Sequence, residues 1–255
     1  MLNKYWNRAA ALAAALLLSA GNLAVAQTTL LSEDFEGLTL KDATSATETA
    51  APGVWTDEAP AGWTRDNTTT PLGDPVEFQG WTFLNKDWWI STAGDQDRST
   101  FTAGQGVVAV ADPDQYDDGT DIDTGNFNVF LSTPAIDLSG IAAGSVRVQF
   151  DSSFRAEVTQ IGQLDVSYDG TTYTNILEYD SAQLNDGEVY NDAVDLTLSN
   201  PAGGSMWLRW GMVQGSNDWW WAVDNINVSG RQVPEPATAT LAAMAGLALL
   251  GFRRR

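Results

Sequence analysis

The sequence contains no cysteine and no histidine. The first absence excludes disulfide bonds and cysteine nucleophiles, and the second excludes histidine general bases and Ser-His-Asp triads. Together the two absences remove the thiolate and imidazole ligands on which zinc, copper and haem sites depend. The metal-binding chemistry that remains for this protein is that of oxygen ligands.

Positive charge is also scarce. The 255 residues include 13 Lys and Arg against 33 Asp and Glu, which gives a formal net charge of −20. Such a surface repels phosphate backbones and attracts divalent cations. We therefore expect no nucleic-acid partner, and the charge suits an exported protein that stays soluble.

The N-terminus has the pattern of a signal peptide. Lys4 and Arg8 precede an apolar run from Ala9 to about Ala20, and Ala24-Val25-Ala26 supplies the small residues of a cleavage site. We predict a signal peptide over residues 1–26, cleaved after Ala26. The alternative is an uncleaved anchor, for which the run is short of the ~20 residues that a membrane span needs.

The C-terminus ends in a second targeting pattern. Val233-Pro234-Glu235-Pro236 precedes a mostly apolar run, Ala237 to Phe252, and the chain closes on three arginines that would stay cytoplasmic. Residues 233–255 resemble the PEP-CTERM sorting signal of Gram-negative bacteria. The resemblance implies Val233, Pro234, Glu235 and Pro236 as the sorting motif and an exosortase as the processing partner. It also implies transient inner-membrane anchoring by the C-terminal transmembrane helix, and a final location that is secreted or on the cell surface. A simple C-terminal membrane anchor is the alternative.

Between these ends the apolar residues alternate. The segments 146–150, 164–168 and 206–212 each place apolar residues at every second position, which predicts strands with one buried face. Asp169-Gly170 predicts a hairpin turn, and Pro201 to Gly204 breaks the chain further on. Residues 41–61 predict a long surface loop, and no interior segment predicts a helix convincingly. We expect an all-β fold, with a single jelly-roll β-sandwich over residues 27–232.

Six motifs along this region resemble MAM-like jelly rolls and related bacterial adhesion sandwiches. They are EDFEG (33–37), GW (62–63), DRST (97–100), LSTPAIDLSG (131–140), IGQLDVSYDG (161–170) and WAVDNI (221–226). The cysteines common in animal MAM domains are missing here, and DRST only approximates the corresponding motif. The resemblance implies that the first and last strands lie close together and help to hold a buried, structural Ca²⁺. By motif position, Glu36 and Asp224 become its primary ligands, with Asp34 and Asp97 as weaker candidates.

The chemistry of these residues agrees with calcium, because Ca²⁺ takes six to eight oxygen ligands and needs neither His nor Cys. The alternative is that Glu36 and Asp224 are ordinary turn or surface carboxylates. A second acidic segment, Asp112 to Asp123, looks like a cation loop. It fails the EF-hand pattern at its fifth, sixth and twelfth positions, so it predicts weak cation binding or a solvated loop.

Three consecutive tryptophans precede the last motif. On an extended strand Trp219 and Trp221 point to one face and Trp220 to the other. One interpretation is that all three pack the sandwich, as large aromatics usually do. The other is that Trp220, with Trp88 or Trp89, forms a ligand-binding platform for a sugar ring.

These observations favour a non-catalytic surface or extracellular-matrix protein that mediates adhesion or exopolysaccharide association. A stand-alone carbohydrate-binding module is the alternative. A glycoside hydrolase that uses two carboxylates is the least favoured, because 33 acidic residues make any chosen pair unremarkable. We therefore expect no enzymatic activity, and we expect an extracellular polysaccharide or a surface glycan as the ligand.

Overall fold

The computed structural model describes residues 27–44, 49–68, 79–92, 94–116, 127–155, 157, 159–184, 188–215 and 219–233. The chain divides into two units, one from Thr29 to Gly230 and one that comprises residues 1–28 with 231–255. The predicted signal peptide and the sorting segment from Pro234 onward lie outside the described residues. The β-sandwich belongs to the unit from Thr29 to Gly230.

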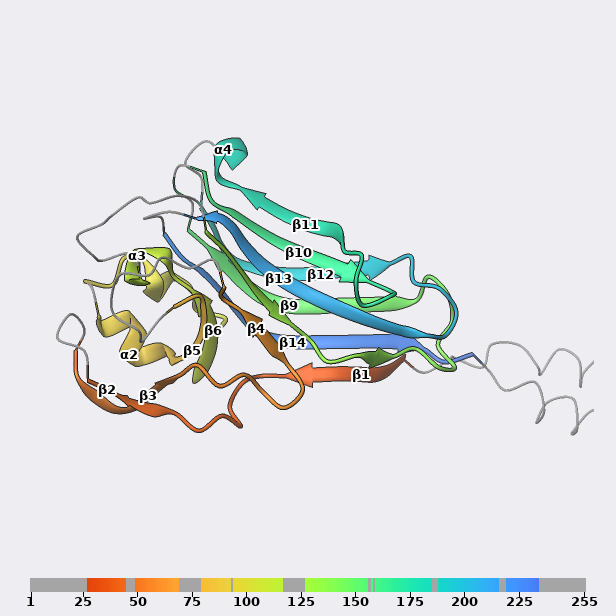
Figure 1. Ribbon diagram of the computed structural model, residues 1–255, viewed down its shortest axis with the longest axis horizontal. Helices are drawn as coiled ribbons and strands as arrows, with labels where there is room; N and C mark the ends of the chain where they lie inside the picture. The colour runs from red at the N-terminus through yellow and green to blue at the C-terminus, as the bar shows by residue number, and fades with distance from the viewer. Residues whose placement is uncertain are drawn as a thin grey trace, which may run out of the picture. The chain divides into compact units, whose positions relative to one another are not determined.

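Two sheets form a sandwich (Figure 1). The larger sheet has the order β12 (Val189–Leu198), β9 (Val146–Phe154), β14 (Trp221–Arg231), β6 (Val107–Ala111), β5 (Trp81–Asn85), β3 (Ala51–Thr56) and β2 (Lys41–Ala43), and β1 (Gln27–Glu33) also pairs with β14. The smaller sheet has the order β11 (Thr174–Asp180), β10 (Ile161–Ser167), β13 (Ser205–Gly215), β7 (Phe127–Ser132) and β4 (Thr64–Asp66), and β8 (Ile136–Asp137) also pairs with β13.

The strand order is that of a jelly roll. From β6 onward the chain crosses between the sheets, so that β6-β14-β9-β12 in one sheet faces β7-β13-β10-β11 in the other. Strands β1, β2, β3 and β5 extend the larger sheet. The first strand thus lies beside the last, as Figure 1 shows for β1 and β14. The all-β sandwich predicted from the sequence is confirmed.

The strands predicted from alternation are present. Segments 146–150, 164–168 and 206–212 fall in β9, in β10 with the residue after it, and in β13. Asp169 and Gly170 form the expected turn between β10 and β11, where Gly170 has a φ of +76° that a side chain would disfavour. The Asp169 carboxylate accepts hydrogen bonds from the backbone N–H groups of Thr171 and Thr172 at 2.8 and 2.6 Å. Turn chemistry in the sequence therefore located this hairpin correctly.

Residues 41–61 differ from the prediction of a long loop. They contain β2 and β3, which pair and extend the larger sheet. Val54 and Thr56 are buried in alternate positions of β3, and the Trp55 indole N–H donates to the Asp42 carbonyl oxygen at 3.1 Å. The Thr- and Ala-rich composition hid a short alternating strand.

Short helices also occur between the strands of the domain, where the sequence predicted none. They are α2 (Lys86–Ser91), the 3₁₀ helix η1 (Arg98–Thr100), α3 (Pro113–Tyr116) and α4 (Ser181–Leu184). Helix α2 begins where the Asn85 side chain accepts a hydrogen bond from the Trp88 backbone N–H at 3.0 Å, as an N-cap residue does. The helix has less than two turns, too short for helical periodicity to show in the sequence.

The buried residues form two clusters. The main core lies between the sheets and includes Trp81, Trp210 and Trp221. A second cluster includes Trp88, Trp89 and Trp220, residues of α2 and of the segment before β14. Every residue of β6 is buried because alternate side chains of this strand enter the two clusters.

Candidate functional site

The structure brings Glu36 and Asp224 to the same short segment of chain. The Asp224 carboxylate accepts a hydrogen bond from the Gln105 backbone N–H at 2.9 Å, and the Glu36 carboxylate accepts one from the Val107 backbone N–H at 2.9 Å. Between them lies Gly106, with a φ of +52°, where an added Cβ would stand 1.9 Å from Glu36 Oε1. Only glycine permits this approach. We call these two carboxylates with segment 105–107 the carboxylate clasp.

The clasp joins the buried carboxylate of Asp224 to the exposed side chain of Glu36. Asp224 is 1% exposed, and burial raises its pKa to about 7, against the lowering effect of the Gln105 and Asn225 backbone N–H groups. The charges of Glu36 and Asp151 raise it further. Among the described residues no ion pair includes Asp224 or Glu36. The positive charge that would balance Asp224 is therefore not supplied by a described side chain.

The donor chemistry of the clasp fits a hard cation, since its side chains offer carboxylate oxygens alone. In the described part of the chain no three Asp or Glu residues gather in a metal-holding arrangement. A Ca²⁺ ion at the clasp would thus take its remaining ligands from backbone carbonyl groups and water.

The two weaker candidates lie differently. Asp34 is exposed and accepts a hydrogen bond from the Glu36 backbone N–H at 3.2 Å, so it shapes the turn that carries Glu36. Asp97 lies 3.3 Å from the Arg155 guanidinium and accepts a hydrogen bond from the Tyr190 hydroxyl at 3.5 Å. The charge of Asp97 is not among those that raise the pKa of Asp224. The structure therefore brings Asp34 to Glu36 and gives Asp97 other partners.

The predicted platform residues are buried. Trp220 and Trp89 are 0% exposed and Trp88 is 6% exposed. Trp220 packs edge-on against Trp89, with ring centroids 5.1 Å apart, and Tyr190 stacks on Trp220 at 6.0 Å. The prediction of a sugar platform on Trp220, Trp88 and Trp89 is corrected, because α2 and the segment around η1 cover this side of β6 and β14 and leave no indole face open.

Neighbouring tryptophans do point to opposite sides. Trp221 enters the main core and Trp220 the second cluster. Trp219 packs against the second cluster, on the same side as Trp220. Strand β14 begins only at Trp221, so the alternation of a strand does not apply to Trp219. Trp219 is half-buried, and the Arg155 guanidinium lies 3.7 Å from its ring centroid.

Sequence reasoning missed a buried ion pair beside these tryptophans. Arg98 is 0% exposed, and its Nη2 lies 2.9 Å from Asp112 Oδ2. Arg98 also donates to the Trp89 carbonyl oxygen at 3.0 Å and to Thr92 Oγ1 at 2.6 Å. Asp112, the first residue of the predicted cation loop, is thus committed to Arg98, and residues 117–123 of that loop lie outside the described residues.

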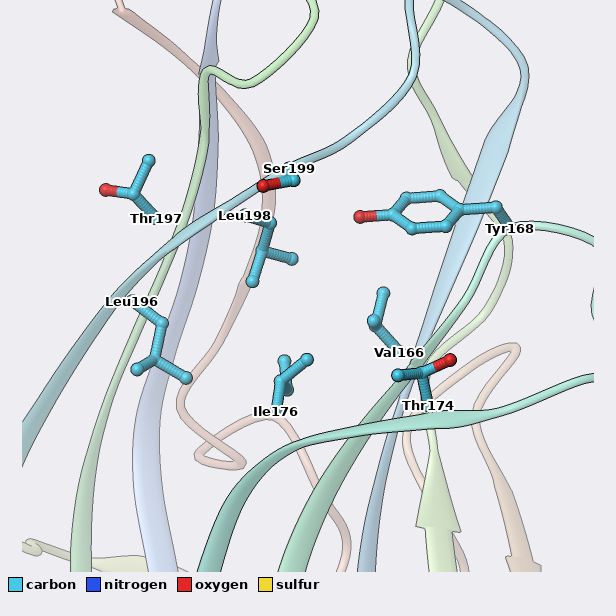
Figure 2. Close-up of a pocket in the computed structure, with 8 residues that line it drawn as sticks. All are labelled: Val166, Tyr168, Thr174, Ile176, Leu196, Thr197, Leu198 and Ser199. Atoms are coloured by element: carbon cyan, nitrogen blue, oxygen red, sulfur yellow. The ribbon is translucent and has the colours of Figure 1, made fainter.

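A groove opens where the two sheets end side by side, along the edge strands β11 and β12 (Figure 2). Its volume is about 370 Å³. Val166, Ile176 and Leu198 point into it, and the Tyr168 ring reaches across from the β10 side. The residues that line it are Val166, Tyr168, Thr174, Ile176, Leu196, Thr197, Leu198 and Ser199, none of which is charged.

Comparison with protein-family models matches residues 232–255 to the PEP-CTERM protein-sorting motif. This match confirms the resemblance seen at Val233 to Pro236 and indicates an exported protein directed to the cell surface. Within the described residues, none of the helices has the length and apolar character required to cross a membrane. A comparison with curated proteins gave no match.

Solved structures give distant similarities. The K1 cleaved adhesin domain of Lys-gingipain from Porphyromonas gingivalis W83 is 16% identical, with 80% of this chain and 99% of that chain covered and a TM-score of 0.47. TmCBM61 in complex with β-1,4-galactotriose is 14% identical, with 68% and 90% covered and a TM-score of 0.38. An apo-form cyclase from Fischerella sp. is 12% identical, with 82% and 98% covered and a TM-score of 0.45. These values are too low to assign a ligand or an activity to this chain.

Proposed function

We propose that this chain is an exported, non-catalytic protein of the cell surface or extracellular matrix, processed by an exosortase, that associates with extracellular glycans. The observation that carries the proposal is the match to the PEP-CTERM protein-sorting motif at residues 232–255, which supports export of the sandwich. The net charge of −20 supports it, because such a domain stays soluble and avoids anionic polymers.

Binding of the purified full chain in mild detergent to a glycan array and to isolated exopolysaccharide tests this proposal. We expect saturable binding to at least one polysaccharide, measured with and without Ca²⁺. A chain that is folded by circular dichroism and binds no polysaccharide under either condition would contradict the glycan-binding role.

The proposed processing predicts a shortened protein at the surface. Mass spectrometry of the surface-associated form should show that the residues beyond Pro236 have been removed. Glu235→Ala should leave the tail intact, because it removes the only charge of the motif, whereas Asp87→Asn in the sandwich should be processed normally. An intact Arg255 on the mature wild-type protein would rule out exosortase cleavage.

We further propose that the carboxylate clasp holds a structural Ca²⁺. The buried Asp224 next to Glu36 and Asp151, with no described cationic partner, supports this proposal. Glu36 follows β1 and Asp224 lies in β14, so an ion shared by both would join the first strand to the last. A domain without disulfides would gain stability from such a link.

A further inference from the structure

The outer face of the smaller sheet carries a row of polar and aromatic side chains around Arg209. The Arg209 guanidinium lies 3.8 Å from the Tyr173 ring centroid and 4.4 Å from that of Phe130. Its Nη2 and Nε donate to Asp165 Oδ2 at 2.8 and 3.3 Å. We call Phe130, Gln163, Asp165, Tyr173, Asn175 and Arg209 the Arg209 strip.

The strip is built across neighbouring strands. Asp165 pairs with Asn175 on one side and with Arg209 on the other. Asp165 faces outward from β10. It is nevertheless only 3% exposed, because three side chains converge on its carboxylate. Besides Arg209, Gln163 Nε2 donates to Asp165 Oδ2 at 2.8 Å and Asn175 Nδ2 donates to Asp165 Oδ1 at 3.4 Å.

A glycine lets the aromatic end of the strip lie close to the sheet. Gly211 stands between Gln163 and Phe130 in the strand register. An added Cβ at Gly211 would come within 2.7 Å of the Phe130 ring and 3.2 Å of Gln163 Cγ. The Phe130 ring and the Gln163 side chain thus lie over a stretch of backbone that carries no side chain of its own.

The strip still has hydrogen-bonding capacity. Arg209 is partly exposed, and its Nη1 has no hydrogen bond among the described residues. Asn175 is exposed, and Gln163, Phe130 and Tyr173 are half-buried. A guanidinium that lies against two aromatic rings, with amide groups bonded to the same carboxylate, matches a sugar, whose hydroxyl groups need polar partners and whose C–H faces pack on rings.

The charges of the side chains around the Arg209 strip favour one class of polysaccharide. The Arg209 charge is matched by Asp165. Two exposed acids, Glu178 and Asp66, stand at the ends of the row that contains Gln163 and Phe130. An acidic polysaccharide would meet these carboxylates, and no described residue of this row offers an unpaired cation to balance the charge of the polymer. The geometry points to the Arg209 strip as the binding site for an uncharged polysaccharide.

This inference rests on the proposed glycan association and names its site and ligand class. The test uses the full chain, in mild detergent, on an array of neutral glucans, mannans, galactans and xylans beside polymers of uronic acids. Asn175→Ala and Arg209→Lys each should weaken binding to the neutral ligand about tenfold or more. The lysine keeps the charge but loses the planar fork that bonds Asp165.

A matched pair of tyrosines controls for position. Tyr173 lies in the strip and Tyr168 in the groove of Figure 2, and the two flank the same turn. Tyr173→Ala should weaken binding, whereas Tyr168→Ala should retain it, with thermal unfolding of both variants measured to confirm that they fold.

Each outcome of this test has one meaning. Wild-type binding that is lost in Asn175→Ala and Tyr173→Ala but kept in Tyr168→Ala supports the strip. Binding that persists in all strip variants, or is lost only in Tyr168→Ala, overturns the strip as the site and leaves the proposed function standing. Binding to uronic-acid polymers alone overturns the ligand class. No binding to any polysaccharide overturns the proposed function itself.

Discussion

Raising the pH from 5 to 8 in the presence of EDTA should lower the melting temperature of the protein by roughly 5–10 °C, with Asp224 as the cause. The pKa of Asp224 in the folded protein is about 7, above its ordinary value of about 3.9. The folded state therefore holds this proton more tightly than the unfolded state does. The stability that the group contributes is complete below pH 3.9 and is lost as the pH rises through 7. The full loss is on the order of 4 kcal/mol, most of it above pH 5.

Calcium should reverse this loss at pH 8, because the ion would balance the ionised carboxylate. At about 100 times its dissociation constant, an ion that binds the folded state alone contributes roughly 2.7 kcal/mol. Asp224→Asn should unfold with a smaller pH dependence and gain nothing from calcium. Asp87→Asn, at an exposed position in α2, should behave as the wild type does.

Two results would distinguish calcium binding at the clasp from the titration of Asp224. If calcium leaves the wild-type melting temperature at pH 8 unchanged, the clasp does not hold the ion. If Asp224→Asn keeps the full pH dependence of the wild type, another group causes it.

Replacing Arg98 by methionine should cost about 3–5 kcal/mol of unfolding free energy, as the loss of one partner of a buried ion pair does. Asp112 would remain at 2% exposure without its counter-charge, and burial already raises its pKa. The substitution also removes the guanidinium that lies 5.2 Å from the Trp89 ring centroid. Urea denaturation monitored by tryptophan fluorescence measures the change.

The chain supplies its own control for this prediction. Arg147 and Asp195 also form an ion pair, but both side chains are about 40% exposed. Arg147→Met should therefore cost much less unfolding free energy than Arg98→Met does, because solvent screens an exposed pair. The double variant Arg98→Met with Asp112→Leu should be more stable than Arg98→Met alone, since no buried charge is left. Equal costs for Arg98→Met and Arg147→Met would show that burial adds nothing to the Arg98 pair.

The sequence predicted what depends on neighbours along the chain. Alternation identified β9, β10 and β13, and Asp169-Gly170 identified the turn before β11. The proximity of Glu36 and Asp224 was available only through a resemblance, because 187 intervening positions carry no local signal of it. The sequence alone predicts which residues form a strand, but it does not predict which residues from distant parts of the chain lie beside each other.

The wrong prediction at the tryptophans has a physical origin, which is that the covering of a sheet face is a tertiary property. Alternation correctly sent Trp220 and Trp221 to opposite sides, but it could not reveal that α2 covers the outer side. In the same way Gln163, Asp165 and Arg209 read as the outward residues of their strands. Their convergence on Asp165 depends on the register between β10 and β13.

The position of β14 determines how the domain would bear a load. This strand is hydrogen-bonded to β9 on one side and to β6 and β1 on the other, and the sorting segment begins just after it ends at Arg231. A pull on an anchored C-terminus would act first on β14. Such a force would have to break the hydrogen-bond ladders on both sides of β14, whereas a pull on an edge strand such as β12 would have to break only one. A force applied at the C-terminal end of the sandwich would thus enter it at a strand that is held by hydrogen bonds on both sides.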